Sequence, residues 1–116
     1  MRTFLSRPHM SGYEEKFILE AIASNFVAPL GPQLNAFEAS VREYLDMDVF
    51  CVGVSSGSAA LHLALRIAGV GSGDEVWISS MTFAGGIFPV LYMGAIPVFF
   101  DLDPSSWTID VKLLSE

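Results

Sequence analysis

The sequence predicts an α/β fold in which parallel strands are connected by crossover helices and preceded by two further helices. Apolar, strand-like runs at 49–54, 75–79 and 96–102 alternate with helical patterns, which is the order of βαβ units in a parallel sheet. The 116 residues are 52% hydrophobic, which is enough for the core of one domain of ordinary size. Two amphipathic helical patterns come before the first strand-like run.

The two leading helices are expected at 13–24 and 32–47. In the first, apolar residues form one stripe and acidic residues occupy much of the opposite face. The second starts at Pro32, a residue favoured at the first position of a helix, and continues with apolar residues at helical spacing. The segment between them, 25–32, contains two prolines and a glycine and is predicted to be a loop that packs against other residues.

The stretch from Val49 to Gly69 is the strongest local signal. It begins as an apolar, β-branched run, passes through the small residues 56–60, and continues with leucines at helical spacing. This order predicts a strand, a tight turn and a helix. Because a helix N-terminus offers unpaired N–H groups and the positive end of a dipole, the turn is a candidate site for an anion.

Charge and cysteine content exclude some classes of protein. Thirteen acidic and six basic residues give a net charge of −7, with no basic patch, which argues against a nucleic-acid binder. The single cysteine, Cys51, cannot form an internal disulfide, and the N-terminus lacks the apolar segment of a secretory signal. These features predict a cytoplasmic protein.

An uncharged segment, 76–100, is long enough to raise the alternative of a membrane-spanning helix. Its glycines and prolines argue against a single helix, since Gly94 and Pro97 suit the end of one element and the start of another. Two buried elements of an α/β layer are therefore the preferred interpretation.

Residues 53–57 match the G-x-S-x-G pattern of the α/β-hydrolase nucleophile elbow, with Ser55 as the serine. A hydrolase also needs a later acid and histidine, and the only later histidine, His62, lies in the helix that follows at once. A serine hydrolase fragment using Ser55 is therefore the less favoured alternative. The glycines at 69, 71 and 73 follow a helix and precede a strand, which predicts a helix C-cap and turn rather than a dinucleotide loop.

Other polar residues have structural interpretations. Neither His9 nor His62 is assigned to catalysis, and no metal site is predicted. Asp101 and Asp103 end the third strand, where ligand sites gather in α/β sheets, but a role in stopping the strand is favoured. Phe83 follows the second strand and is either a core residue or a flat aromatic surface at the sheet edge, beside the turn at 56–60.

Taken in order, several motifs resemble the DegT/DnrJ/EryC1/StrS group of pyridoxal phosphate (PLP)-dependent aminotransferases, which act on nucleotide-linked keto sugars and have the aspartate aminotransferase fold. The resemblance implies the N-terminal part of a fold type I large domain, with a helical segment at 1–48 and a partial, truncated PLP-binding domain at 49–116. The matching motifs are Gly31 with Phe37-Glu38, residues 56–61, Gly73 to Val76, Thr82-Phe83, Gly94-Ala95, Pro97-Val98 and Asp101 to Asp103.

The resemblance implies roles for particular residues. Gly57, Ser58 and Ala59 would hold the cofactor phosphate through backbone and hydroxyl groups, and Phe83 would stack on the cofactor ring. The implied reaction moves an amine, commonly from glutamate, to a keto sugar on a nucleotide, and the loop at 24–32 resembles the branch that uses UDP-linked 4-keto-6-deoxy sugars. Loop residues expected at the substrate or at the partner subunit of a homodimer are Asn25, Pro29 and Gly31.

The catalytic residues of such an enzyme are not expected in this chain. Transamination needs a Schiff-base lysine and an acid that pairs with the pyridine nitrogen. Neither Lys16 nor Lys112 resembles the family's lysine, which lies far downstream, and Asp101 does not resemble the pairing acid. The 116 residues alone are therefore expected to be inactive, and the alternative is a non-catalytic chain that binds ligand weakly or pairs with a complementary chain.

Overall fold

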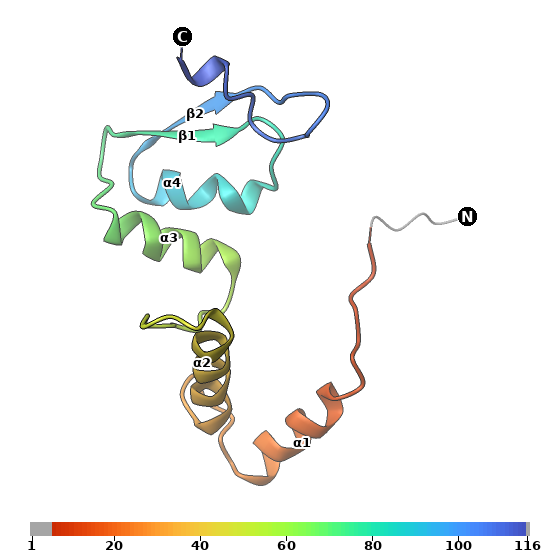
Figure 1. The fold of residues 1–116 in the computed structure, drawn as a ribbon. Helices are drawn as coiled ribbons and strands as arrows, with labels where there is room; N and C mark the ends of the chain where they lie inside the picture. Colours follow the sequence, from red (N-terminus) through yellow and green to blue (C-terminus); the bar gives the residue numbers. More distant parts are fainter. Residues whose placement is uncertain (1–5, 116) are drawn as a thin grey trace. The chain divides into compact units, whose positions relative to one another are not determined.

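The computed structural model describes residues 6–115, which divide after Gly53 into two compact units (Figure 1). The N-terminal unit extends to Gly53 and contains two helices. The C-terminal unit begins at Val54 and contains the remaining helices and a two-stranded parallel sheet.

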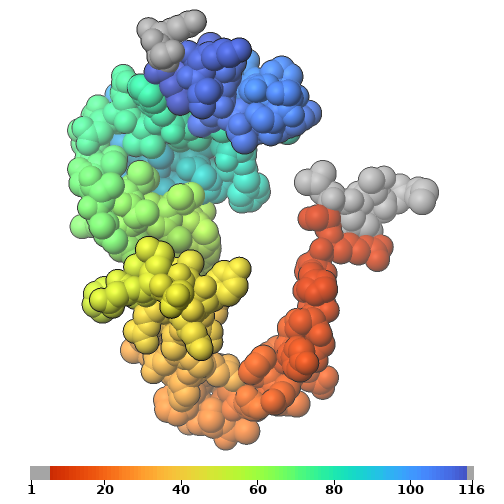
Figure 2. Space-filling model, in the orientation of Figure 1, coloured from red at the N-terminus to blue at the C-terminus, as the bar shows by residue number. Residues whose placement is uncertain are grey.

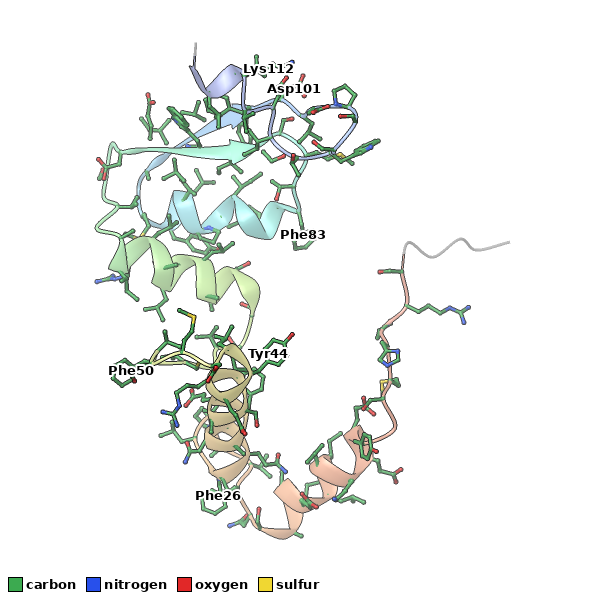
Figure 3. All side chains as sticks on the ribbon, viewed as in Figure 1. Phe26, Tyr44, Phe50, Phe83, Asp101 and Lys112 are labelled. Carbon is green, nitrogen blue, oxygen red and sulfur yellow. The ribbon has the colours of Figure 1, made fainter. Side chains whose placement is uncertain are left out.

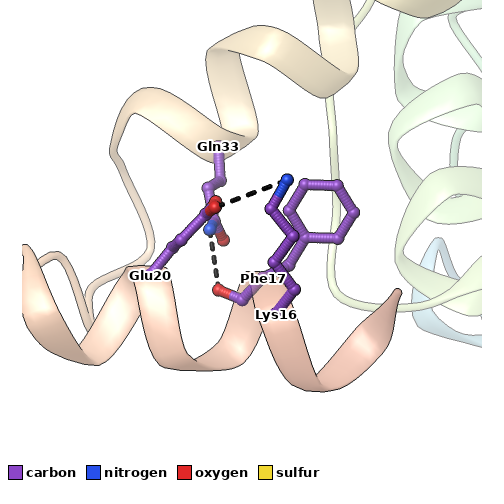
Figure 4. Close-up of polar contacts among 4 residues, drawn as sticks. All are labelled: Lys16, Phe17, Glu20 and Gln33. Atoms are coloured by element: carbon purple, nitrogen blue, oxygen red, sulfur yellow. Dashed lines mark hydrogen bonds and ion pairs between the residues drawn. The ribbon is translucent and has the colours of Figure 1, made fainter. Parts of the chain in front are cut away.

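The first helix of the N-terminal unit, α1 (Glu14–Ala23), confirms the predicted helix at 13–24. Its start is held by the Glu14 carboxylate, which accepts hydrogen bonds from the backbone N–H and hydroxyl of Ser11 at 2.7 and 2.8 Å. On its surface Lys16 forms an ion pair with Glu20 at 3.8 Å (Figure 4).

The second helix, α2 (Pro32–Leu45), starts at Pro32 as predicted and ends two residues before the predicted end. It ends at Asp46, whose left-handed backbone (φ 48°) cannot continue a right-handed helix. A side chain joins the two helices, because Gln33 Nε2 donates a hydrogen bond of 2.8 Å to the carbonyl of Phe17 (Figure 4).

The prediction of a strand at 49–54 is wrong for this structure. The segment is extended but pairs with no strand within residues 6–115. Two of its N–H groups have other acceptors: Val49 donates to a carbonyl two residues earlier, and Gly53 donates to the Glu38 carboxylate at 2.7 Å. Phe50 is 99% exposed and projects from the segment (Figure 3). A strand needs a second strand to pair with, and within residues 6–115 the only paired strands are those at 75–79 and 96–100.

The C-terminal unit starts with α3 (Gly57–Ile67), which confirms the helix predicted after the 56–60 turn. The glycine turn that follows is also confirmed: Gly69 has a φ of 80°, and Val70 donates back to the carbonyl of Leu65 at 3.0 Å. Strand β1 (Glu75–Ser79) then matches the predicted strand residue for residue.

Strand β2 (Ile96–Phe100) lies parallel to β1, with Glu75 opposite Ile96 and Ser79 opposite Phe100. The two predicted strands are therefore confirmed, although β2 ends two residues early. Between them lie the short 3₁₀ turn η1 (Ala84–Gly86) and helix α4 (Phe88–Tyr92). The 76–100 segment is thus divided among four elements: β1, η1, α4 and β2. No helix within residues 6–115 has the length and apolar character to cross a membrane.

The core of the C-terminal unit is small and centred on α4. Pro89 and Val90 in α4 and Ala95 just before β2 are buried, and α4 lies against α3 (Figure 1). The His62 and Tyr92 rings meet edge to face across these two helices, with 5.7 Å between their centroids.

After β2 the chain folds back beside the carboxyl ends of the strands (Figure 1), and its residues form the blue surface in Figure 2. Leu102 and Ile109 form an isolated antiparallel bridge, and Asp110 donates its N–H to the carbonyl of Asp101 at 3.0 Å. The chain continues into a 3₁₀ turn, η2 (Leu113–Ser115). These bonds close residues 101–110 into a loop at the carboxyl end of the sheet.

Candidate cofactor-phosphate site

The start of α3 has two free hydrogen-bond donors. The Ser56 hydroxyl caps the helix by accepting the N–H of Ala59 at 3.1 Å. No hydrogen bond joins the N–H of Gly57 or of Ser58 to an acceptor within residues 6–115. A side-chain carbon added at Gly57 would meet no atom within 4 Å, so the space beside these donors is open. The helix end can therefore accept an anion.

The Ser58 hydroxyl has a different partner. It donates a hydrogen bond of 2.8 Å to the carbonyl of Gly85, which lies 27 residues further along the chain, and this bond is partly buried. Because a serine hydroxyl has a single proton, this bond uses the only proton that it can donate. The bond ties the first turn of α3 to the loop that follows β1.

Phe83 is the aromatic residue of that loop. Its side chain is 87% exposed, and Figure 3 shows it projecting from the turn that leads into α4. A Cβ atom at Gly85 would lie 2.8 Å from Ser58 Oγ and 3.0 Å from two ring carbons of Phe83. The hydroxyl and the edge of the ring therefore flank the same glycine.

This arrangement fits a flat, phosphorylated cofactor. Free N–H groups at the positive end of a helix attract a phosphate, and an exposed aromatic ring nearby offers a face on which a planar heterocycle can stack. Among the three residues predicted to bind phosphate, Gly57 and Ser58 have free N–H groups, whereas the N–H of Ala59 is held by Ser56. The assignment of Gly57, Ser58, Ala59 and Phe83 to a cofactor stays a prediction.

The two aspartates after β2 organise their own loop. Asp101 accepts the N–H of the next residue at 2.8 Å and lies 3.4 Å from the Ser80 hydroxyl. Asp103 accepts the hydroxyl of Ser105 at 2.6 Å and its N–H at 2.8 Å, and these bonds lower the pKa of Asp103. Both carboxylates thus have local partners in the loop that follows β2. No group of metal-ligating side chains was found in the part of the chain that the structure describes.

A hydrolase arrangement around Ser55 is not present within residues 6–115. The His62 ring contacts Tyr92, and no hydrogen bond joins it to Ser55. His9 lies exposed in the segment before α1. The nucleophile-elbow pattern is therefore a match in sequence without the geometry of a triad.

The loop of the N-terminal unit contains a small pocket. It has a volume of about 200 Å³ and is lined by residues of the loop and of both helices, including Ser24, Phe26, Leu30 and Gly31. Of the three predicted substrate residues, Gly31 lines this pocket, whereas Asn25 and Pro29 do not. Their assignment to a substrate stays a prediction.

The two lysines lie on surfaces with local partners. Lys16 pairs with Glu20 on α1. Lys112 lies in the turn before η2, where its amide donates to Asp110 at 3.0 Å, and Figure 3 shows it well apart from Phe83, across the sheet.

The parallel α/β unit and its helix start together define the N-terminal part of a large domain of fold type I, the fold of many PLP-dependent transferases. The sequence pattern of the DegT/DnrJ/EryC1/StrS aminotransferase family matches residues 9–116. The chain belongs to this family.

Two curated relatives illustrate the match. EpsN of Bacillus subtilis, whose name describes it as a pyridoxal phosphate-dependent aminotransferase, is 45% identical over 113 residues, covering 97% of this chain and 29% of the relative. GDP-perosamine synthase of Caulobacter vibrioides is 32% identical over 113 residues, covering 97% of this chain and 30% of the relative. The chain thus spans less than a third of the length of these relatives.

Solved structures agree on the fold. An aminotransferase from Psychrobacter cryohalolentis superposes with a TM-score of 0.83 at 29% identity, covering 97% of this chain and 29% of that one. The sugar aminotransferase Spr1654 of Streptococcus pneumoniae in its PLP form gives a TM-score of 0.79 at 26% identity, covering 98% and 29%. The fold predicted from the sequence is therefore confirmed.

Proposed function

We propose that this chain forms the phosphate-binding and ring-stacking part of the PLP site of a nucleotide-sugar aminotransferase. The observation that carries the proposal is the pair of free N–H groups at Gly57 and Ser58, next to the exposed ring of Phe83. Membership of an aminotransferase family supports the choice of PLP among flat, phosphorylated cofactors.

In this proposal each residue has a limited task. Bound PLP supplies the electron sink through which an amino group is exchanged. Gly57 and Ser58 hold the phosphate through their N–H groups, and Ala59 adds a third donor if its bond to Ser56 is exchanged for one to the phosphate. Phe83 orients the cofactor by contact with its ring. The reactive lysine and the acid that pairs with the pyridine nitrogen come from residues outside these 116.

The proposed substrate is a keto sugar linked to a nucleotide, with an amino acid, glutamate, as the amine donor. Names among the relatives, such as GDP-perosamine synthase, support the sugar class. A UDP-linked 4-keto-6-deoxy sugar is the finer proposal, with Asn25, Pro29 and Gly31 at the sugar or at the partner subunit of a homodimer. The proposed location is the cytoplasm.

The test is PLP binding by the protein at its natural length, followed by the absorbance of the bound cofactor. Replacing Phe83 by Ala removes the stacking surface and is expected to weaken PLP binding about tenfold, since an aromatic contact contributes about 0.5–1.5 kcal/mol beyond its buried area. Thermal stability should change little, because the ring is 87% exposed.

Phe83→Tyr is the matched control, because it keeps the ring and should retain the affinity. Equal PLP affinity in Phe83→Ala and the unmodified protein would rule out Phe83 as the stacking residue. Failure of the unmodified protein to bind PLP would reject the function itself.

A further inference from the structure

We infer that Glu38 is a positioning residue for the proposed phosphate site, because its carboxylate holds the chain that enters α3. The inference rests on the proposed function and adds a residue of α2 to it. Phe37-Glu38 is one of the motifs that resemble the family, and neither residue belongs to the start of α3 itself. The contacts of the glutamate show how it can act there.

The carboxylate of Glu38 has a backbone partner. Its Oε1 atom accepts the N–H of Gly53 at 2.7 Å, in a partly buried position 15 residues further along the chain. Within residues 6–115 this carboxylate forms no ion pair, although Arg42 lies one turn further along the same helix. Because a hydrogen bond to a charged acceptor is stronger than one between neutral groups, the contact holds the chain firmly at Gly53.

Gly53 lets the chain lie close against α2. A Cβ atom at this position would lie 2.5 Å from Leu34 Cδ1, so the leucine side chain would have to move. The same point lies 3.6 Å from Glu38 Oε1 and 3.7 Å from Phe37 Cδ1. The absence of a side chain therefore allows the N–H of Gly53 to approach the carboxylate on the surface of α2.

The bond at Gly53 is the last hydrogen bond on the chain before the cap of α3. The extended segment 49–54 has no partner strand within residues 6–115, and the backbone of Val54 and of Ser55 makes no hydrogen bond there. The next bond is the cap that the Ser56 hydroxyl makes to Ala59. Since three extended residues span at most about 10 Å, the bond at Gly53 limits where the cap can lie.

This limit acts on the first turn of α3. The free N–H groups of Gly57 and Ser58 belong to this turn, and helix ends fray more readily than helix interiors. The Ser58 hydroxyl ties the turn to Gly85, but a bound phosphate can exchange that bond for one of its own. The Glu38 bond contains no phosphate donor of the site, so it persists when the phosphate is bound. It therefore keeps the two free N–H groups directed at one point.

The test compares PLP with pyridoxal, which has the same ring and no phosphate, in the protein at its natural length. Glu38→Ala removes the acceptor and should weaken PLP binding about tenfold, the effect of losing one hydrogen bond to a charged group. Pyridoxal binding should change little, because its ring contact at Phe83 lies on the loop after β1 and not on the chain that Glu38 holds.

Matched variants separate the acceptor from the rest of the side chain. Glu38→Gln keeps an oxygen acceptor and should restore most of the PLP affinity. Glu43→Ala removes an exposed glutamate of the same helix and should leave both affinities unchanged. In the cofactor-free protein, hydrogen exchange at the Gly53 amide should be faster in Glu38→Ala than in Glu38→Gln, because only the alanine variant leaves the amide without its acceptor.

Three results would overturn the inference. Equal losses of PLP and pyridoxal affinity in Glu38→Ala would make the role of Glu38 a general structural one. Unchanged affinities in that variant would leave Glu38 without a role in the site. A Glu38→Gln variant that binds PLP no better than Glu38→Ala would show that the hydrogen-bond acceptor is not what the site needs.

If Glu38→Ala does not fold, Glu38→Asp carries the same test, because its carboxylate is one methylene shorter and does not reach the Gly53 N–H. Failure of the unmodified protein to bind PLP would instead reject the proposed function. The two failures are distinct, because the inference concerns differences between variants and the function concerns the unmodified protein.

Discussion

The two units of this protein have similar sequence signals and different degrees of burial. Both contain helices with clear apolar stripes, yet among residues 6–114 only the C-terminal unit has buried residues, which are Pro89, Val90 and Ala95. None of residues 6–53 is buried. An apolar stripe determines which face of a helix can be covered, but burial requires a second layer that covers it. In the C-terminal unit α4 packs against both α3 and strand β2.

The units also differ in their long-range polar contacts. In the C-terminal unit the Ser58 hydroxyl joins two segments that are 27 residues apart. In the N-terminal unit the Glu38 carboxylate holds the N–H of Gly53 at 2.7 Å, 15 residues away. Within residues 6–115, each unit therefore has one partly buried side-chain hydrogen bond that joins segments at least 15 residues apart.

The largest effect is expected in the core of the C-terminal unit. Val90 is 2% exposed, and Val90→Asp would place an unpaired charge there. We expect a loss of about 3–5 kcal/mol in the free energy of unfolding. Urea denaturation measures this free energy of unfolding. Val27→Asp, at a position that is 74% exposed in the N-terminal unit, should have almost no effect. Equal losses of stability in Val90→Asp and Val27→Asp would show that the two units do not differ in burial.

A smaller effect is expected for the polar contact of the N-terminal unit. Glu38→Ala removes the acceptor of the Gly53 N–H and should cost about 1–2 kcal/mol. Glu38→Gln keeps an oxygen acceptor and should recover much of this loss. The control is Glu43→Ala on the same helix. Thermal denaturation followed by circular dichroism distinguishes the variants, and a loss no greater than that of Glu43→Ala would show that the contact contributes nothing.

The smallest expected effect is a loss of stability at the start of α1 when the pH is lowered. Hydrogen bonds from Ser11 lower the pKa of Glu14 from 4.5 to about 2. Because the folded-state pKa is the lower one, the stabilisation of the start of α1 is present above about pH 4.5 and is lost as the pH falls toward about 2. Carboxyl chemical shifts measured by NMR report the titration.

Ser11→Ala removes the hydroxyl donor and keeps the backbone N–H, which is the largest cause of the shift, so it should raise the pKa of Glu14 only in part. Ser40→Ala, which removes a hydroxyl bonded within α2, should leave it unchanged. A Glu14 titration that Ser11→Ala does not move would contradict the structure of this helix start.

Prediction from sequence succeeded where short-range patterns decide the structure. The helices at 14–23, 32–45 and 57–67, strand β1 and the turn at Gly69 follow from periodicity, capping residues and glycine. The 49–54 run shows the limit of such patterns. Its apolar, β-branched composition permits a strand, but a strand forms only beside another backbone, and composition contains no information on whether one is there.

For the site, the sequence by itself determined the start of α3 after Ser56, and it predicted an anion at this start and a ring-stacking role for Phe83. The cap from Ser56 to the N–H of Ala59 and the free N–H groups of Gly57 and Ser58 also follow from the local start of a helix. Only the tertiary structure decided the partner of the Ser58 hydroxyl, which is the carbonyl of Gly85. These two residues are 27 positions apart, and no local pattern encodes their contact.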